Sequence, residues 1–126
     1  MTGTVNYTKG TIILSQAPLS HIPPIFGKIS IARREKTWAI ESFVLFNSAK
    51  SLADYGAGSS DNISQSLNST GTPSWWTWNI ESQFELSEQV HAQIGVHNIL
   101  DVHYKPFSSG ISAPGRGLFV ALHANF

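Results

Sequence analysis

GLFVALHANF (117–126) alternates between apolar side chains and smaller or polar ones along its length. One parity is entirely apolar and consists of Leu118, Val120, Leu122, Ala124 and Phe126. The other parity consists of Phe119, Ala121, His123 and Asn125. Because successive side chains of a β-strand point to opposite faces, this period of two predicts a strand with one apolar face.

Outward from this strand, similar alternating runs recur between clusters of turn residues. The pattern predicts six strands, over 4–13, 26–34, 38–47, 75–86, 90–100 and 117–126. Long and short connections alternate, and in chain order they cover 15–24, 35–37, 48–74, 87–89 and 101–116. The fold class we expect is therefore all-β: an antiparallel up-and-down meander of about six strands, with its long loops at one end.

The composition excludes several classes of function. The chain of 126 residues suits one domain, and its 8 Lys and Arg balance 8 Asp and Glu, which leaves no basic surface for nucleic acid. With no cysteine, the chain has no disulfide, no thiolate nucleophile and no Cys-ligated zinc. The longest apolar run, LFVAL (118–122), is far shorter than the roughly 18 residues of a membrane helix, whereas a spanning strand needs only about 9–11 residues.

The two faces of the predicted sheet allow two environments. In the last three strands one parity is aliphatic or aromatic, and the other carries His, Gln, Glu, Thr and Asn. An outer-membrane barrel shows this pattern with lipid outside and water in the lumen. A soluble sandwich shows the same period with its polar face in water. Trp75, Trp76 and Trp78 fit either an interfacial aromatic girdle or a core cluster.

HNILDVHYKPFSSGISAPGRGLFVALHANF (97–126) resembles the carboxyl-terminal signature of TonB-dependent outer-membrane receptors. The residues that match this family motif are Asn98, Asp101, Tyr104, Pro114, Gly115 and Arg116, with Phe126 as the terminal aromatic. PLSHIPP (18–24) and TPSWWTWNIESQFEL (72–86) are similar to two further segments of the family. The segment SGISAPGR (109–116) is most similar to the corresponding segment in receptors of the Bacteroidota type.

The resemblance implies that residues 1–126 are the carboxyl-terminal portion of a 22-stranded transmembrane β-barrel, without the plug domain and the signal peptide. It implies the outer membrane of a Gram-negative bacterium. The complete receptor would take up a scarce nutrient such as a ferric siderophore, haem or cobalamin, and transport by this portion alone is not expected. The implied partners are membrane lipid, the barrel-assembly machinery, and the remaining strands and plug of the receptor, with TonB contacting the plug; nucleic acid is not among them.

The resemblance also gives the last strand two roles. Phe126 would be part of the signal that the barrel-assembly machinery reads. Leu118, Val120 and Leu122 would share its face on the strand that closes the barrel. Closure matters physically because an open edge in lipid leaves backbone N–H and C=O groups without partners.

Catalytic and metal chemistry are not expected from the residue spacing. His91 and His97 share a parity and His123 lies on the polar face of the next strand. Strand residues six apart are separated by about 20 Å, so His91 and His97 cannot share an ion. Glu81 and Glu85 lie about 13 Å apart along their strand, too far for the paired carboxylates of a glycosidase. We therefore expect no enzyme, no metal site and no cofactor.

Ligand contact is expected in the long loops. The candidates are Tyr55, Trp75, His103 and Tyr104. Arg116 is expected to pair with Asp101 as part of the geometry of the last hairpin. The alternative to a receptor is a soluble antiparallel β-domain that binds a ligand or a partner. If the chain is a barrel portion, its exposed apolar parity predicts aggregation in water without detergent.

Overall fold

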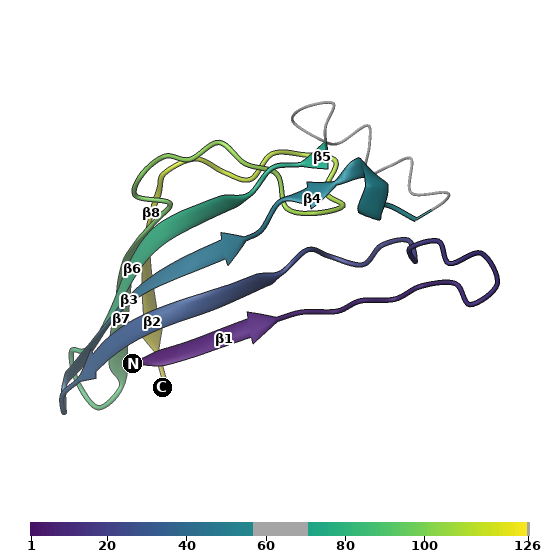
Figure 1. The fold of residues 1–126 in the computed structure, drawn as a ribbon. Coiled ribbons are helices and arrows are strands. Elements are labelled where there is room, and N and C mark those ends of the chain that lie inside the picture. Colours follow the sequence, from purple (N-terminus) through teal and green to yellow (C-terminus); the bar gives the residue numbers. More distant parts are fainter. Residues whose placement is uncertain (57–70, 126) are drawn as a thin grey trace.

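Six long strands form one antiparallel sheet in the computed structural model, which describes residues 1–56 and 71–125 (Figure 1). The elements in chain order are β1 (Thr2–Asn6), β2 (Phe26–Arg34), β3 (Trp38–Asn47), β4 (Lys50–Ser51), the 3₁₀ turn η1 (Leu52–Asp54), β5 (Gly71–Thr72), β6 (Trp75–Glu85), β7 (Val90–His97) and β8 (Gly117–Ala124). Among the described residues, no helix is long and apolar enough to cross a membrane.

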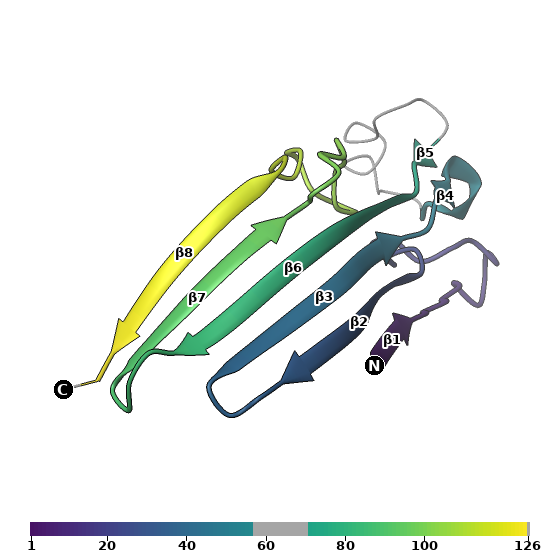
Figure 2. The same ribbon diagram turned by 90° about the vertical axis from the view of Figure 1, so that its left-hand side faces the viewer.

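Each long strand pairs with the next long strand along the chain, in the order β1-β2-β3-β6-β7-β8. All of these pairings are antiparallel. β4 and β5 form a separate two-stranded ribbon within the connection from β3 to β6. Figure 2 shows that the sheet is curved, with β1 and β8 at its two edges. The predicted all-β antiparallel meander is confirmed.

The three long connections leave the sheet at one end, and the two tight turns join strands at the other end (Figure 2). The long connections cover 7–25, 48–74 and 98–116, and the short ones cover 35–37 and 86–89. This arrangement follows from an up-and-down path, because every second connection of such a sheet lies at the same end. The alternation of lengths in the sequence predicts it.

The first predicted strand, 4–13, is wrong beyond Asn6. β1 ends there because its partner β2 begins at Phe26, which pairs with Asn6. The residues that would have to pair with 7–13 in this register are 19–25, and they include Pro23 and Pro24, which have no N–H to donate to a ladder. The chain instead folds back on itself, and the N–H of Ile12 donates to the Ala17 carbonyl (2.8 Å).

Other strand ends also differ from the prediction: β1 begins at Thr2 and not at residue 4, and β6 ends at Glu85 and not at residue 86. The strand expected over 90–100 ends at His97, because Asn98 has φ 50° and turns the chain out of the ladder. The last strand is assigned as far as Ala124, and Phe126 lies outside the described residues. The connection 48–74, expected to be a loop throughout, contains the β4–β5 ribbon and the turn η1.

Burial in this sheet is the reverse of that in a soluble domain. One face, called here the apolar face, leaves large apolar side chains exposed, including Leu118 at 74% and Leu122 at 72%. The other, called here the polar face, contains the buried strand residues Ser30, Phe43, Asn47, Thr77 and Asn79. In the described part of the chain, Phe43 and Tyr55 are the buried hydrophobic residues. The sheet therefore has a continuous apolar surface, and no described residues form a second layer over it.

Candidate functional site

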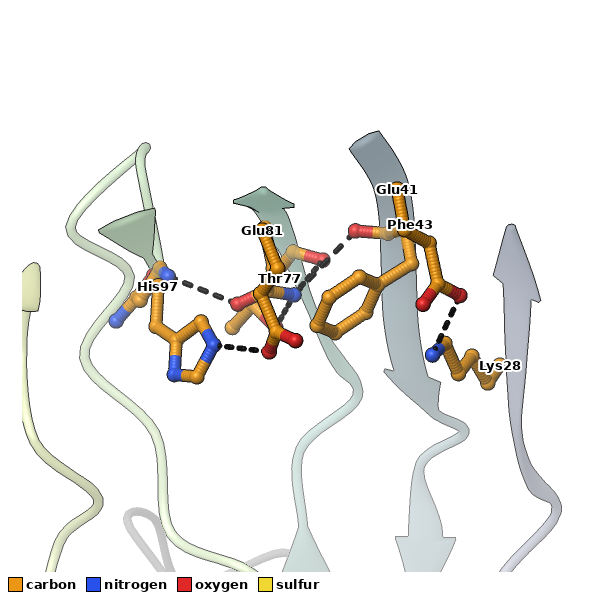
Figure 3. A network of polar contacts seen from close by, with 8 residues as sticks. Lys28, Glu41, Phe43, Thr77, Glu81 and His97 are labelled. Atoms are coloured by element: carbon orange, nitrogen blue, oxygen red, sulfur yellow. Dashed lines mark hydrogen bonds and ion pairs between the residues drawn. The ribbon is translucent and has the colours of Figure 1, made fainter. Parts of the chain in front are cut away.

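The polar face carries two ion pairs connected through aromatic rings (Figure 3). Lys28 Nζ lies 2.7 Å from Glu41 Oε1 and 4.0 Å from the centroid of the Phe43 ring. The alternation of β2 and β3 places these three side chains on the same face, because Lys28 and Phe43 are diagonal neighbours across the pair.

The second pair lies on β6 and β7 and is an ion pair when His97 is protonated. His97 Nε2 is 2.7 Å from Glu81 Oε1, and the His97 ring meets Phe43 edge-on with centroids 6.0 Å apart. The other side of the His97 ring contacts Phe119, with centroids 5.1 Å apart. Because both ion pairs remain partly exposed, each contributes little to stability, about 1 kcal/mol at most. Their effect is to line this face with paired charge.

Buried amides connect the polar face to the last long loop. Thr77 is 2% exposed, and Asn79 Nδ2 donates to Thr77 Oγ1 (3.2 Å) and to the Phe43 carbonyl (3.4 Å). Asn79 Oδ1 accepts the backbone N–H of Asn98 (2.9 Å). The side chain of Asn79 thus holds the point at which the chain leaves β7.

Asn98, the first residue of the family motif, ties the two ends of this loop together. It is 4% exposed, and its Oδ1 accepts the N–H of Val102 (2.9 Å). Its Nδ2 donates to the carbonyls of Val102 (2.9 Å) and Pro114 (3.3 Å). The Asp101 N–H donates to the Asn98 carbonyl (2.8 Å), which closes a tight turn. A residue that tolerates positive φ and carries an amide is required here.

Asp101 and Arg116 are in contact, but the contact involves the backbone of Arg116 and not its side chain. Asp101 Oδ1 accepts the backbone N–H of Arg116 (2.8 Å), rather than a guanidinium hydrogen. At Gly115 a Cβ would lie 2.6 Å from the same oxygen, so a side chain there would displace the carboxylate. The motif residues at 98, 101, 114, 115 and 116 therefore form the clasp of the loop 98–116.

Two of the four candidate ligand contacts lie together. The Trp75 and Tyr104 rings stack with their centroids 4.0 Å apart and their planes at 31°. Burial raises the pKa of the Tyr104 phenol above its ordinary value. Trp75 Nε1 is buried and, within the described residues, has no hydrogen-bond partner. The pair forms an aromatic platform at the loop end of β6.

Tyr55 belongs to a different cluster. It is 8% exposed, its hydroxyl shares a hydrogen bond with Thr72 Oγ1, and its ring meets Phe107 with centroids 6.3 Å apart. Lys50 Nζ lies 4.7 Å from the Phe107 ring and donates to the Ile22 carbonyl. Burial lowers the pKa of Lys50, an effect that nearby Asp54 partly opposes. In this arrangement the Tyr55 side chain is buried at the base of the loops, and its contact with a ligand stays a prediction.

His103 remains within the last loop, where its Nε2 is 2.9 Å from Ser112 Oγ. Lys50 and Phe107 are contact residues that sequence reasoning did not identify. Their cluster joins residues from all three long connections, because Ile22, Lys50 and Phe107 come from different loops. Hydrophobic periodicity in the sequence does not predict contacts between residues of three different loops.

Two hollows lie at opposite ends of the sheet. One, of about 320 Å³, lies between the first long loop and the start of the second, and Leu19, Pro24 and Lys50 help to line it. The other, of about 630 Å³, lies near the short turns on β3, β6, β7 and β8. Among the described residues, no group of three His, Asp or Glu side chains is gathered as it would be to hold a metal ion.

The residues expected to close a barrel lie on the edge strand. Leu118, Val120 and Leu122 are exposed on the apolar face of β8. In the described sheet, the second edge of β8 and the second edge of β1 have no neighbouring strand. The role of Phe126 stays a prediction.

In the described residues, these observations define the chain as a six-stranded antiparallel sheet, one layer thick, with two free edges and one exposed apolar face. The sequence matches no family model and no curated protein. Among solved structures, the copper transporter OprC has a similar fold, with a TM-score of 0.81 and 14% sequence identity. The match covers 98% of this chain and 20% of that transporter, so the chain spans about a fifth of its length. At this identity the likeness shows the fold alone.

Proposed function

We propose that the chain is the carboxyl-terminal section of the transmembrane β-barrel of a TonB-dependent receptor in a bacterial outer membrane. The main observation that supports this proposal is the exposed apolar face. In the described sheet, no protein side chains cover Leu118, Val120 and Leu122. Lipid would cover that face, and the paired charges of the polar face would line a wet lumen. The fold likeness to a section of a transporter supports the same interpretation.

The arrangement of the connections supports an orientation. Outer-membrane barrels have short periplasmic turns and longer extracellular loops. In this orientation the clasp of the loop 98–116, the Trp75–Tyr104 platform and the Tyr55 cluster would lie at the extracellular mouth. The short turns at 35–37 and 86–89 would face the periplasm.

Transport is proposed for the complete receptor and not for this section. The free edges of β1 and β8 need further strands, because unpaired backbone groups are costly in lipid. The other strands, the plug and TonB acting on the plug are the partners this proposal requires. We propose a scarce nutrient as cargo: a ferric siderophore, haem or cobalamin, or a copper ion by analogy with the similarly folded copper transporter.

An immunoblot of the outer-membrane fraction of the source cells, with an antibody against residues 101–126, tests the proposal. We expect a band several times heavier than the 13.8 kDa of this chain. A band at 13.8 kDa in the soluble fraction would contradict the receptor and favour a soluble β-domain. As a second test, purified chain should require detergent to remain monomeric, whereas a soluble domain would not.

A further inference from the structure

The register of the last three strands brings together three side chains with metal-binding chemistry (Figure 2 shows these strands side by side). Glu85 of β6 is directly opposite His91 of β7, and His91 is directly opposite His123 of β8. All three lie on the polar face, since they share its parity. Directly opposite residues of antiparallel strands have Cβ atoms about 4.5–5.5 Å apart.

We propose that His91 and His123 form a clamp for a divalent late first-row transition-metal ion, with Glu85 as the adjoining carboxylate. Neutral imidazole is a good ligand for copper, nickel and zinc ions, which a row of carboxylates alone would not select. Two imidazoles on neighbouring strands can approach one ion from both sides, whereas His91 and His97 on one strand cannot.

The surroundings of the pair suit a cation. Both imidazoles line the hollow of about 630 Å³ near the short turns, which has room for water to complete the coordination of an ion. The charged side chains that line the same hollow are Arg34, Glu35 and Glu85, and the Glu35 carboxylate is paired with the Arg33 guanidinium (2.9 Å). Glu85 is therefore the carboxylate that would balance the charge of a bound ion.

A neighbouring contact orients one of the two rings. His123 Nε2 lies 3.1 Å from Asn125 Oδ1, so an N–H at Nε2 donates to that amide and Nδ1 is the nitrogen offered to the ion. Histidines that bind metal ions usually donate their other N–H to an oxygen in this way. The described side chains form no three-ligand metal group, so the clamp has two protein ligands, His91 and His123, and water completes the coordination. Glu85 adjoins the ion and becomes a third ligand only if its side chain reorients.

The inference rests on the register of β7 and β8 and not on the proposed transport function. A chain that proves soluble but keeps this register would keep the clamp. Conversely, a receptor whose chain binds no ion here would leave the proposed function intact. The two proposals can therefore fail separately.

Cu²⁺ binding to the full, untagged chain in detergent micelles tests the clamp, with electron paramagnetic resonance to count the nitrogen ligands. We expect two nitrogens in the native chain and one in His91→Gln or His123→Gln. Loss of a residue that hydrogen-bonds to a metal ligand costs about 10–100-fold in metal affinity. Loss of a ligand itself should therefore weaken Cu²⁺ binding by at least about 10-fold. His97→Gln is the matched control, and it should leave the spectrum and the affinity unchanged. Unchanged binding in His91→Gln and His123→Gln would overturn the proposal, as would an equal loss in His97→Gln.

A second measurement needs no variant and therefore does not depend on how a substituted chain folds. Bound copper with ascorbate and oxygen oxidises the histidines nearest the ion, and mass spectrometry of the digested chain locates them. We expect oxidation at His91 and His123 in preference to His97 and His103 at a Cu²⁺ concentration that saturates one site. Equal oxidation of all four, or preference for His97 or His103, would overturn the clamp.

Discussion

At Gly115 the absence of a side chain allows the last loop to close, because a Cβ there would lie 2.6 Å from Asp101 Oδ1. We expect Gly115→Ala to displace this carboxylate, to weaken its hydrogen bond from the Arg116 N–H, and to cost about 1 kcal/mol. Limited proteolysis of the loop 98–116 measures the effect. Gly117→Ala is the control, since a Cβ at Gly117 meets nothing within 4 Å. Equal cleavage of the two variants would contradict this account.

Tyr104 gives a prediction on pH at the same scale. Burial raises the pKa of its phenol, so the folded loop favours the neutral form. The resulting stability is present below the pKa of an unfolded tyrosine, about 10, and is lost as the pH rises through the higher folded pKa. Ultraviolet titration of the chain in detergent should therefore show an ionisation later than that of ordinary tyrosine. Tyr104→Phe should remove this late step, and its persistence in that variant would assign it elsewhere.

At the scale of the elements, the closure of the loop 98–116 depends on the side chain of Asn98. Asn98→Ala removes one acceptor and two donated hydrogen bonds from a buried amide, and we expect a loss of about 2 kcal/mol. Hydrogen exchange at the Val102 amide reports the lost acceptor. Asn98→Asp keeps an oxygen that can accept the Val102 N–H but loses the two hydrogen bonds that Nδ2 donates. In this variant the Val102 amide should still exchange slowly, while the contact with the Pro114 carbonyl is lost. Fast exchange at Val102 in both variants would show that Oδ1 is not its partner.

The strands also show what the sequence can predict. β2 and β3 have the predicted bounds, because both alternate cleanly and a tight turn at 35–37 fixes their register. β1 is shorter than predicted because a strand needs a partner, and the prolines facing 7–13 cannot provide one. The resemblance identified the residues of the clasp, but not that Asp101 accepts a backbone N–H. The contacts among Ile22, Lys50 and Phe107 depend on three loops meeting, which no local pattern encodes.

For the whole molecule, hydrophobic periodicity alone did not distinguish lipid from water as the surroundings of the apolar face. Burial shows which face of the described sheet lacks a protein cover. A soluble sandwich would bury its apolar parity against a second sheet, whereas here the polar face contains the buried strand residues Ser30, Thr77 and Asn79. Since the apolar face is continuous across the strands, its cover must come from outside the described sheet.

A charge placed on each face of β8 tests this conclusion. Val120 is 63% exposed on the apolar face, and its neighbour Ala121 is on the polar face. If lipid covers the apolar face, Val120→Arg should cost about 2–4 kcal/mol near the middle of the membrane, while Ala121→Arg should be tolerated in a wet lumen. Urea unfolding of the complete receptor reconstituted in lipid vesicles measures both variants against the native protein. If water covers the apolar face, Val120→Arg should change stability by no more than about 0.5 kcal/mol, as for other exposed positions. That outcome would contradict the transmembrane proposal, because one exposed valine cannot be both indifferent to charge and immersed in hydrocarbon.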